Sequence, residues 1–182
     1  MIFTEKSIML KDGRTALLRS PKESEAAEIL TFITRACGET DFLMRYPEEY
    51  ADYTPEREAA FLRDLNASPD QVMICCLVDG RVAGNCQLTF KTGMKERHRA
   101  TVAIGILEEF WNRGIGTALF REMIELARSR GVRQLELDFL EGNSRARALY
   151  EKMGFRITGV KPDAIRLRDG RLLNEYMMMK LL

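Results

Sequence analysis

The stretch FWNRGIGTALF, residues 110–120, most constrains how this chain can fold, because it places two glycines between two different apolar patterns. The preceding run ATVAIGI, residues 100–106, is typical of a strand, and apolar residues recur at helical spacing from 115 to 130. Glycine weakens a helix by roughly 1 kcal/mol relative to alanine. Gly114 and Gly116 therefore indicate a demand other than helix stability at the point where a helix begins.

Two interpretations of this glycine turn stay open on the residues alone. The first is a tight connection between a strand and a helix. The second is an anion site, because a helix N-terminus carries unpaired N–H groups and a partial positive charge. Glycines let phosphate approach those N–H groups closely, and a neighbouring arginine can add a charge-assisted hydrogen bond. The residues that would form such a cradle are Arg113, Gly114, Ile115, Gly116 and Thr117.

The spacing of the turn excludes two common nucleotide motifs. A Walker loop ends in Gly-Lys-Ser/Thr, but Gly116 is followed by Thr117 with no lysine. A dinucleotide fingerprint needs a third glycine where this chain has Leu119. Any bound phosphate must belong to another class of ligand.

The rest of the chain predicts an alternating order of strands and helices in one domain. Three Asp-Gly pairs between strand-like runs favour hairpins, and a further strand, QLELDFL, follows the long helix. The hairpin turns are expected at Asp12-Gly13, Asp79-Gly80 and Asp169-Gly170. Helices are expected from Ser20 and Pro21, from Thr54-Pro55, from Ile115 to a Gly131 cap, and from an Asn143 or Ser144 cap to Gly154. No linker, repeat or low-complexity tract divides residues 1–182, so a single mixed α/β domain is predicted.

Composition limits the classes of partner and cofactor. Lys and Arg total 28 against 27 Asp and Glu, so the net charge of +1 provides no general field for nucleic acid or an anionic membrane. One histidine and four cysteines without a C-x-x-C pair argue against a metal site and favour a reduced, cytoplasmic protein. No signal peptide and no apolar run of membrane-spanning length are evident.

Residues 103–155 resemble the core of the GCN5-related N-acetyltransferase (GNAT) family. That family combines a Gln/Arg-x-x-Gly-x-Gly/Ala loop after its fourth strand, an Asn near the end of its fifth strand, and a short helix with Ala-x-x-x-Tyr before Gly-Phe. The matching positions are Gly114, Gly116, Asn143, Ala146, Tyr150 and Gly154-Phe155. One position departs from the pattern, because Trp111 replaces the usual first Gln or Arg of the loop.

The resemblance implies a fold and a co-substrate. The implied fold is a mixed, mostly antiparallel central sheet of about seven strands with about four helices, in which the fourth and fifth strands splay apart. Acetyl-CoA would bind with its diphosphate on the glycine loop and its peptide-like arm along the backbone of Ile104 and Ile106. Gly105 could let this strand bend away, or could mark a simple bulge.

The resemblance also assigns roles to two residues of the following helix. Tyr150 would act as the general acid that protonates the leaving thiolate, whereas periodicity alone favours a core tyrosine. Asn143 could contact the coenzyme, and its simpler role is a helix cap. Glu108, Glu109 and Asp138 are the nearest acidic residues, and none is nominated as catalytic.

The expected activity is acetyl transfer from acetyl-CoA to a primary amine of a small molecule or a peptide. The expected acceptor segments are residues 36–53 and 160–170, where aromatic and acidic side chains such as Tyr50, Tyr53 and Glu49 would suit a cationic amine or simply form an amphipathic connection. A non-catalytic acyl-CoA-binding module is the alternative from another class. A homodimer is open, since no self-complementary surface is evident.

Overall fold

The computed structural model describes residues 1–182 and divides into two compact units. The first unit contains residues 1–89 and 103–121, and the second contains residues 90–102 and 122–182. The chain has eight β-strands and four α-helices, in agreement with the predicted mixed, mostly antiparallel α/β fold. The prediction of a single domain stays a prediction.

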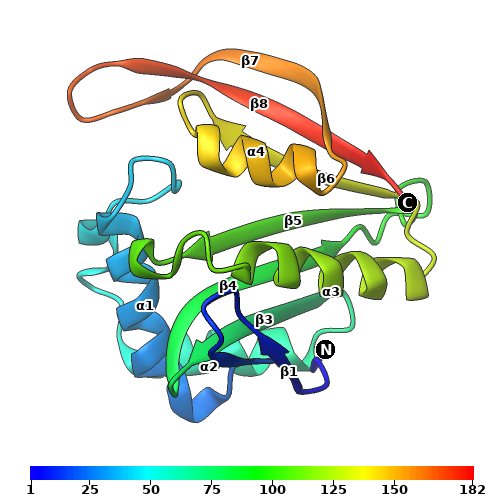
Figure 1. Ribbon diagram of the computed structural model, residues 1–182. Coiled ribbons are helices and arrows are strands. Elements are labelled where there is room, and N and C mark those ends of the chain that lie inside the picture. The colour runs from blue at the N-terminus through cyan, green and yellow to red at the C-terminus, as the bar shows by residue number, and fades with distance from the viewer. The chain divides into compact units, whose positions relative to one another are not determined.

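The first unit is built on two hairpins whose strands run in the order β1-β2-β3-β4, all antiparallel (Figure 1). The strands are β1 (Lys6–Met9), β2 (Thr15–Arg19), β3 (Gln71–Val78) and β4 (Arg81–Phe90). At the predicted turn between β3 and β4, Asp79 has φ +51° and Gly80 has φ +79°. Two left-handed residues in succession match the twist of a tight hairpin, and Asp-Gly is a preferred pair for this conformation.

Two helices accompany these strands. Helix α2 (Pro55–Ala67) begins as predicted, because the Thr54 side chain accepts a hydrogen bond from the N–H of Arg57 at 3.3 Å. Helix α1 (Ala26–Gly38) begins later than predicted. Pro21 lies ahead of it, and a 3-10 turn, η1 (Glu23–Glu25), comes between, with the Glu25 carboxylate accepting from the N–H of Lys22 at 2.8 Å.

Strand β3 is the most continuously buried strand of the first unit. Seven consecutive residues of this strand, Val72–Val78, are buried. Burial of successive residues means that side chains on both faces of the strand are covered. The cysteines contribute to the core, since all four are free and buried, at Cys37, Cys75, Cys76 and Cys86.

In the second unit the strand order is β5-β6-β8-β7, with β5 (Arg99–Ile106) shared between the units. The other strands are β6 (Gln134–Leu140), β7 (Arg156–Arg166) and β8 (Leu172–Leu181). β5 and β6 are parallel and pair over residues 99–101 and 134–136, whereas β6, β8 and β7 pair antiparallel. The predicted divergence of β5 from β6 concerns residues 103–106, which belong to the first unit, and it stays a prediction.

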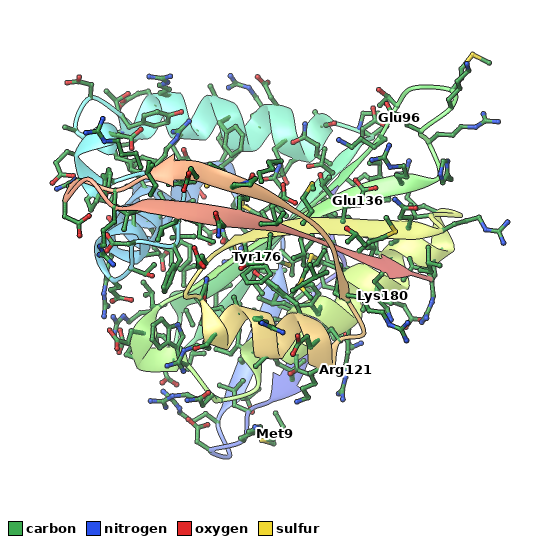
Figure 2. The ribbon with its side chains drawn as sticks, turned by 90° about the horizontal axis from the view of Figure 1, so that it is seen from above. Met9, Glu96, Arg121, Glu136, Tyr176 and Lys180 are labelled. Carbon is green, nitrogen blue, oxygen red and sulfur yellow. The ribbon has the colours of Figure 1, made fainter.

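Ion pairs and helix caps fix the ends of these elements in the second unit. Arg99 binds Glu96 at 2.9 Å and Glu136 at 2.9 Å, and both carboxylates are labelled in Figure 2. The helices are α3 (Ile115–Ser129), whose last part lies in this unit, and α4 (Ser144–Lys152). Gly131 and Gly154, with φ +74° and +87°, follow their ends as predicted. No helix combines the length and the hydrophobicity that crossing a membrane would require.

Candidate active site

The glycine loop of the first unit contains two left-handed residues at the start of a helix. Asn112 and Gly114 have φ +62° and +97°, on either side of Arg113. Helix α3 begins at Ile115, and the N–H of Ala118 donates to the carbonyl of Gly114 at 3.0 Å. The main-chain N–H groups of a first helical turn point toward the N-terminal end of the helix.

Trp111 closes this loop onto the end of β5. Its indole Nε1 donates a hydrogen bond to the carbonyl of Ile106 at 2.8 Å, and its own N–H donates to the carbonyl of Glu108 at 3.0 Å, across the 3-10 turn η3 (Glu108–Phe110). The residue that departs from the family pattern thus shapes the loop. This bond engages one main-chain group of Ile106, a residue whose backbone is expected to pair with the coenzyme arm.

The close approach of strands at this end of β5 depends on Gly84 of β4. A Cβ atom on Gly84 would lie 2.9 Å from the carbonyl oxygen of Gly105 and 2.9 Å from Cγ1 of Ile106. A Cβ on Gly105 would meet only Asn85 Oδ1 at 3.5 Å and Phe32 Cζ at 4.0 Å, which are ordinary contacts. The glycine that packing requires is therefore Gly84, which sequence reasoning had passed over. Residues 104–106 of β5 are half-buried.

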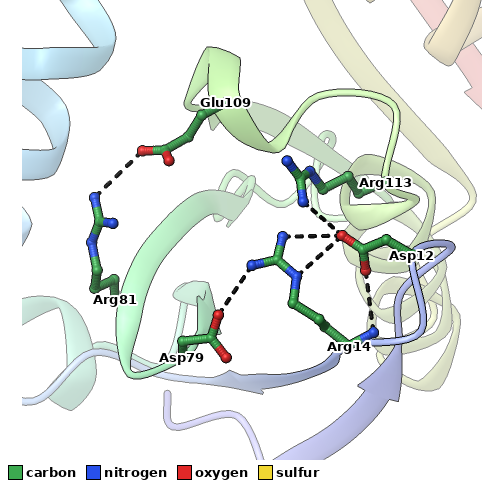
Figure 3. A network of polar contacts seen from close by, with 6 residues as sticks. All are labelled: Asp12, Arg14, Asp79, Arg81, Glu109 and Arg113. Atoms are coloured by element: carbon green, nitrogen blue, oxygen red, sulfur yellow. Dashed lines mark hydrogen bonds and ion pairs between the residues drawn. The ribbon is translucent and has the colours of Figure 1, made fainter.

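Arg113, the arginine predicted to bind phosphate, makes an ion pair with the turn between β1 and β2 (Figure 3). Its Nη1 lies 2.6 Å from Oδ2 of Asp12, and the same carboxylate binds Arg14, which also reaches Asp79 at 3.0 Å. Hydrogen bonds from Arg14 and then Arg113 lower the pKa of Asp12 to about 2. Both guanidinium groups also lie over the ring of Phe110, at 5.8 and 5.7 Å. We call these five residues the Asp12 network.

Lys11 is a second basic residue at the loop. Its N–H donates to the carbonyl of Arg113 at 3.0 Å, and its Cγ lies 3.6 Å from the point where a Cβ of Gly114 would stand. Sequence reasoning missed Lys11 and Asp12, because Asp12 and Arg113 lie 101 positions apart and no local pattern joins them.

Two acidic residues beside the loop are engaged in other interactions. Glu109 pairs with Arg35 at 2.7 Å and with Arg81 at 3.4 Å (Figure 3), and Arg35 is the main reason that its pKa is lowered. The N–H of Glu108 donates to the carboxylate of Glu39 at 2.6 Å. These contacts tie α1 to the turn after β5, and an ionised, paired Glu109 is a poor proton acceptor.

Tyr150 lies in an aromatic cluster of the second unit. Only 7% of its surface is exposed, and its ring centre is 6.1 Å from that of Phe139 and 6.4 Å from that of Phe155. Tyr176 of β8, labelled in Figure 2, stacks on Phe139 at 5.3 Å. Burial raises the pKa of Tyr150 to about 12, so the phenol keeps its proton at neutral pH. Such a group can donate a proton but cannot accept one.

The second unit also holds the predicted Asn143. Its side chain accepts a hydrogen bond from the N–H of Ala146 at 3.2 Å, so the capping role is confirmed. Asp138 lies 3.6 Å from the ammonium of Lys161. The structure thus gathers Ile104, Ile106 and the loop in one unit, and Asn143 and Tyr150 in the other.

Comparison with known proteins identifies the class to which these parts belong. Residues 39–155 match the model of the acetyltransferase (GNAT) family. This span is well over half of the 182 residues, so the chain belongs to that family. The predicted membership of the GNAT family is confirmed.

Individual relatives and solved structures show which acetyltransferases the chain is similar to. The chain is 31% identical over 109 residues to the L-amino acid N-acetyltransferase AaaT of Escherichia coli (strain K12). The alignment spans 59% of this chain and 66% of AaaT, which is just under two thirds of that protein. A GNAT acetyltransferase structure from Streptococcus pneumoniae has a TM-score of 0.84 and 31% identity, covering 92% of this chain and 99% of that one. The structure of yncA from Salmonella typhimurium, solved with its cofactor acetyl-CoA, has a TM-score of 0.77 over 92% and 94% of the two chains, but at 17% identity it shows the fold alone.

Proposed function

We propose that this protein transfers the acetyl group of acetyl-CoA to a primary amine by direct attack of the amine on the thioester. The observation that carries the proposal is the loop with left-handed Asn112 and Gly114 at the start of α3. Main-chain N–H groups in this arrangement suit a diphosphate, because they offer several donors at the positive end of a helix. The family to which the chain belongs, and the acetyl-CoA bound to yncA, support the same ligand.

The space beside Gly114 is open enough for a diphosphate. Within 4 Å of the point where a Cβ of Gly114 would stand, the only atom outside its chain neighbours is Cγ of Lys11. We assign the N–H groups of Arg113, Gly114, Ile115, Gly116 and Thr117 to the diphosphate. The Lys11 ammonium adds positive charge nearby. The half-buried backbone of Ile104 and the N–H of Ile106 are assigned to the peptide-like arm of the coenzyme.

The transfer needs a neutral amine, a site for negative charge and a proton for sulfur. The nitrogen of the neutral amine forms a bond to the thioester carbonyl carbon, and this nitrogen then gives one proton to water. An N–H group of β5 stabilises the oxygen that becomes negative. The carbon–sulfur bond then breaks, and sulfur keeps the electron pair. The products are an acetamide and the free thiol of CoA.

We assign the proton that sulfur receives to the hydroxyl of Tyr150, which regains a proton from solvent after each turnover. Burial keeps this proton in place at neutral pH, and the thiolate takes it up as the carbon–sulfur bond breaks. Asn143 fixes the start of the helix that carries Tyr150 through its bond to Ala146. A contact of Asn143 with the coenzyme is part of the proposal.

The experiment is free-thiol release from acetyl-CoA with a panel of amines, beside a thermal-shift titration with CoA. We expect CoA to raise the melting temperature and at least one amine to release thiol above the hydrolysis background. Stabilisation by CoA with no release from any amine would instead support a binding module. No stabilisation at all would contradict the assignment of the loop.

A further inference from the structure

Two arginines lie over the rings of two tyrosines in the connection between α1 and α2 and in the first turn of α2. Tyr50, in the 3-10 turn η2 (Pro47–Tyr50), and Tyr53 meet edge to face with ring centres 5.6 Å apart. The guanidinium carbon of Arg45 lies 5.6 Å from the Tyr50 ring centre, and that of Arg57 lies 4.0 Å from the Tyr53 ring centre. We call Arg45, Tyr50, Tyr53 and Arg57 the arginine–tyrosine cluster. Both arginines are exposed and both tyrosines are half-buried.

Neither arginine of this cluster pairs with a carboxylate, although acidic residues surround them in sequence. The carboxylate of Glu49 accepts from the N–H of Tyr46 at 2.8 Å. Glu56 is held by main-chain and Thr54 hydrogen bonds, which lower its pKa. Six other arginines of the first unit do have carboxylate partners, namely Arg14, Arg19, Arg35, Arg63, Arg81 and Arg113. The two guanidinium groups of the cluster are therefore held by aromatic rings and not by carboxylates.

Helix α1 links this cluster to the end of β5 within the first unit. Phe32 lies beside Gly105, and Glu39 accepts the hydrogen bond from Glu108 described above. Turn η2, which contains Tyr50, packs against α1. Figure 1 shows α1 next to the turn that follows β5. Helix α1 thus connects the segment that carries Tyr50 with the strand to which we assign the thioester arm.

We propose that the arginine–tyrosine cluster binds a carboxylate carried by the acceptor, so that the preferred acceptor is an amino acid with a free carboxylate and not an amine without an acidic group. The inference rests on the proposed transferase function. Guanidinium groups bind carboxylates through paired, charge-assisted hydrogen bonds. Their contacts with the tyrosine rings restrain them in advance, which reduces the entropy lost on binding.

A carboxylate bound by the arginines leaves the amine of the acceptor uninvolved in recognition. The site therefore separates recognition, at the carboxylate, from reaction, at the amine.

The test compares L-amino acids with their C-terminal amides as acceptors, using thiol release at saturating acetyl-CoA. The amide has the less basic amine, so reactivity alone favours the amide over the acid. We expect the wild-type kcat/KM to favour the acid by about tenfold or more, as a site built for a charged group rejects a neutral analogue. In Arg57→Gln and Arg45→Gln we expect at least a tenfold loss for the acid, mostly in KM, and little change for the amide.

The matched control is Arg63→Gln, because Arg63 is another exposed arginine of α2 but pairs with Glu23 at 3.1 Å. It should leave both acceptors unchanged. Equal use of acids and amides by the wild type, or equal losses for both in the cluster variants, would overturn the carboxylate assignment while leaving the transferase in place. Absence of thiol release with every acid and every amide would instead overturn the proposed function itself.

Discussion

The glycine loop of the first unit and Tyr150 of the second are held in opposite ways. The loop is fixed by left-handed backbone at Asn112 and Gly114 and by exposed ion pairs of the Asp12 network. Tyr150 is fixed by burial among Phe139 and Phe155. Exposed ion pairs are weak and are screened by salt, whereas buried aromatic contacts are not. The glycine loop should therefore respond to changes in charge and in backbone conformation. Tyr150 should respond to changes in the side chains of the aromatic cluster and not to salt.

The largest effect should come from Tyr150→Phe, which removes the proton and keeps the ring. We expect turnover to fall about tenfold or more, with little change in the Kd for CoA, because a general acid acts only in the transition state. Steady-state kinetics and calorimetric titration check the two quantities. The control is Tyr176→Phe, which removes a hydroxyl from the same aromatic cluster. Unchanged turnover in Tyr150→Phe, with chemistry shown to limit the rate, would remove Tyr150 from the mechanism.

Gly114→Ala should have the next largest effect, and it acts on the glycine loop. At φ +97° an alanine is strained by about 1 kcal/mol or more, so the Kd for CoA should rise about fivefold as the loop relaxes from its binding conformation. Gly131→Ala is a matched control, because Gly131 has φ +74° with open space around it at the other end of α3. Both variants should lose stability in urea denaturation. A rise in Kd of similar size in both would contradict the role of the loop.

Asp12→Asn should have a smaller effect, confined to the order of the loop. We expect faster amide exchange at Asn112, Arg113 and Gly114 at low salt, and a difference from wild type that shrinks as salt is added. Asp169→Asn, at the turn between β7 and β8, is the control. The pKa of Asp12 falls from 3.8 to about 2, so in the wild type this contribution is complete above pH 3.8 and is lost as the pH falls toward 2. A difference in exchange between Asp12→Asn and wild type that does not change with salt would contradict the ionic account.

An effect of a different kind is expected at alkaline pH, and it concerns burial. Burial raises the pKa of Cys75 and of Cys76 from 9.0 to about 12, and that of Tyr150 from 10.0 to about 12. Each raised pKa stabilises the folded state fully below the ordinary value, and this stabilisation is lost as the pH rises toward 12. The free energy of unfolding in urea should therefore decline from about pH 9 upward. Tyr150→Phe should show a shallower decline above pH 10.

The sequence predicts the parts of the fold that depend on local chemistry. The hairpin at Asp79-Gly80, the Thr54 cap and the Asn143 cap each follow from one or two residues and their neighbours, and the structure confirms them. The start of the first helix was misplaced at Pro21, since a 3-10 turn competes with the helix there.

Contacts between distant segments lie beyond such reasoning. Asp12 makes its ion pair with Arg113 only because separate elements pack together. The same is true of the close approach of Gly84 to Gly105, which leaves no room for a Cβ atom on Gly84. The left-handed Asn112 carried a usable signal, because asparagine is enriched in that conformation. Arg45 and Arg57 look like ordinary surface charges until the structure shows that no carboxylate pairs with them.

The most direct measurement of the central claim is a titration of the ¹⁵N-labelled protein with CoA and, separately, with pantetheine, which lacks the diphosphate. If main-chain N–H groups bind the diphosphate, the amide signals of residues 112–117 shift with CoA and stay in place with pantetheine. The signals of residues 104–106 should respond to both. Amides of residues 112–117 that do not respond to CoA, while others do, would contradict the account.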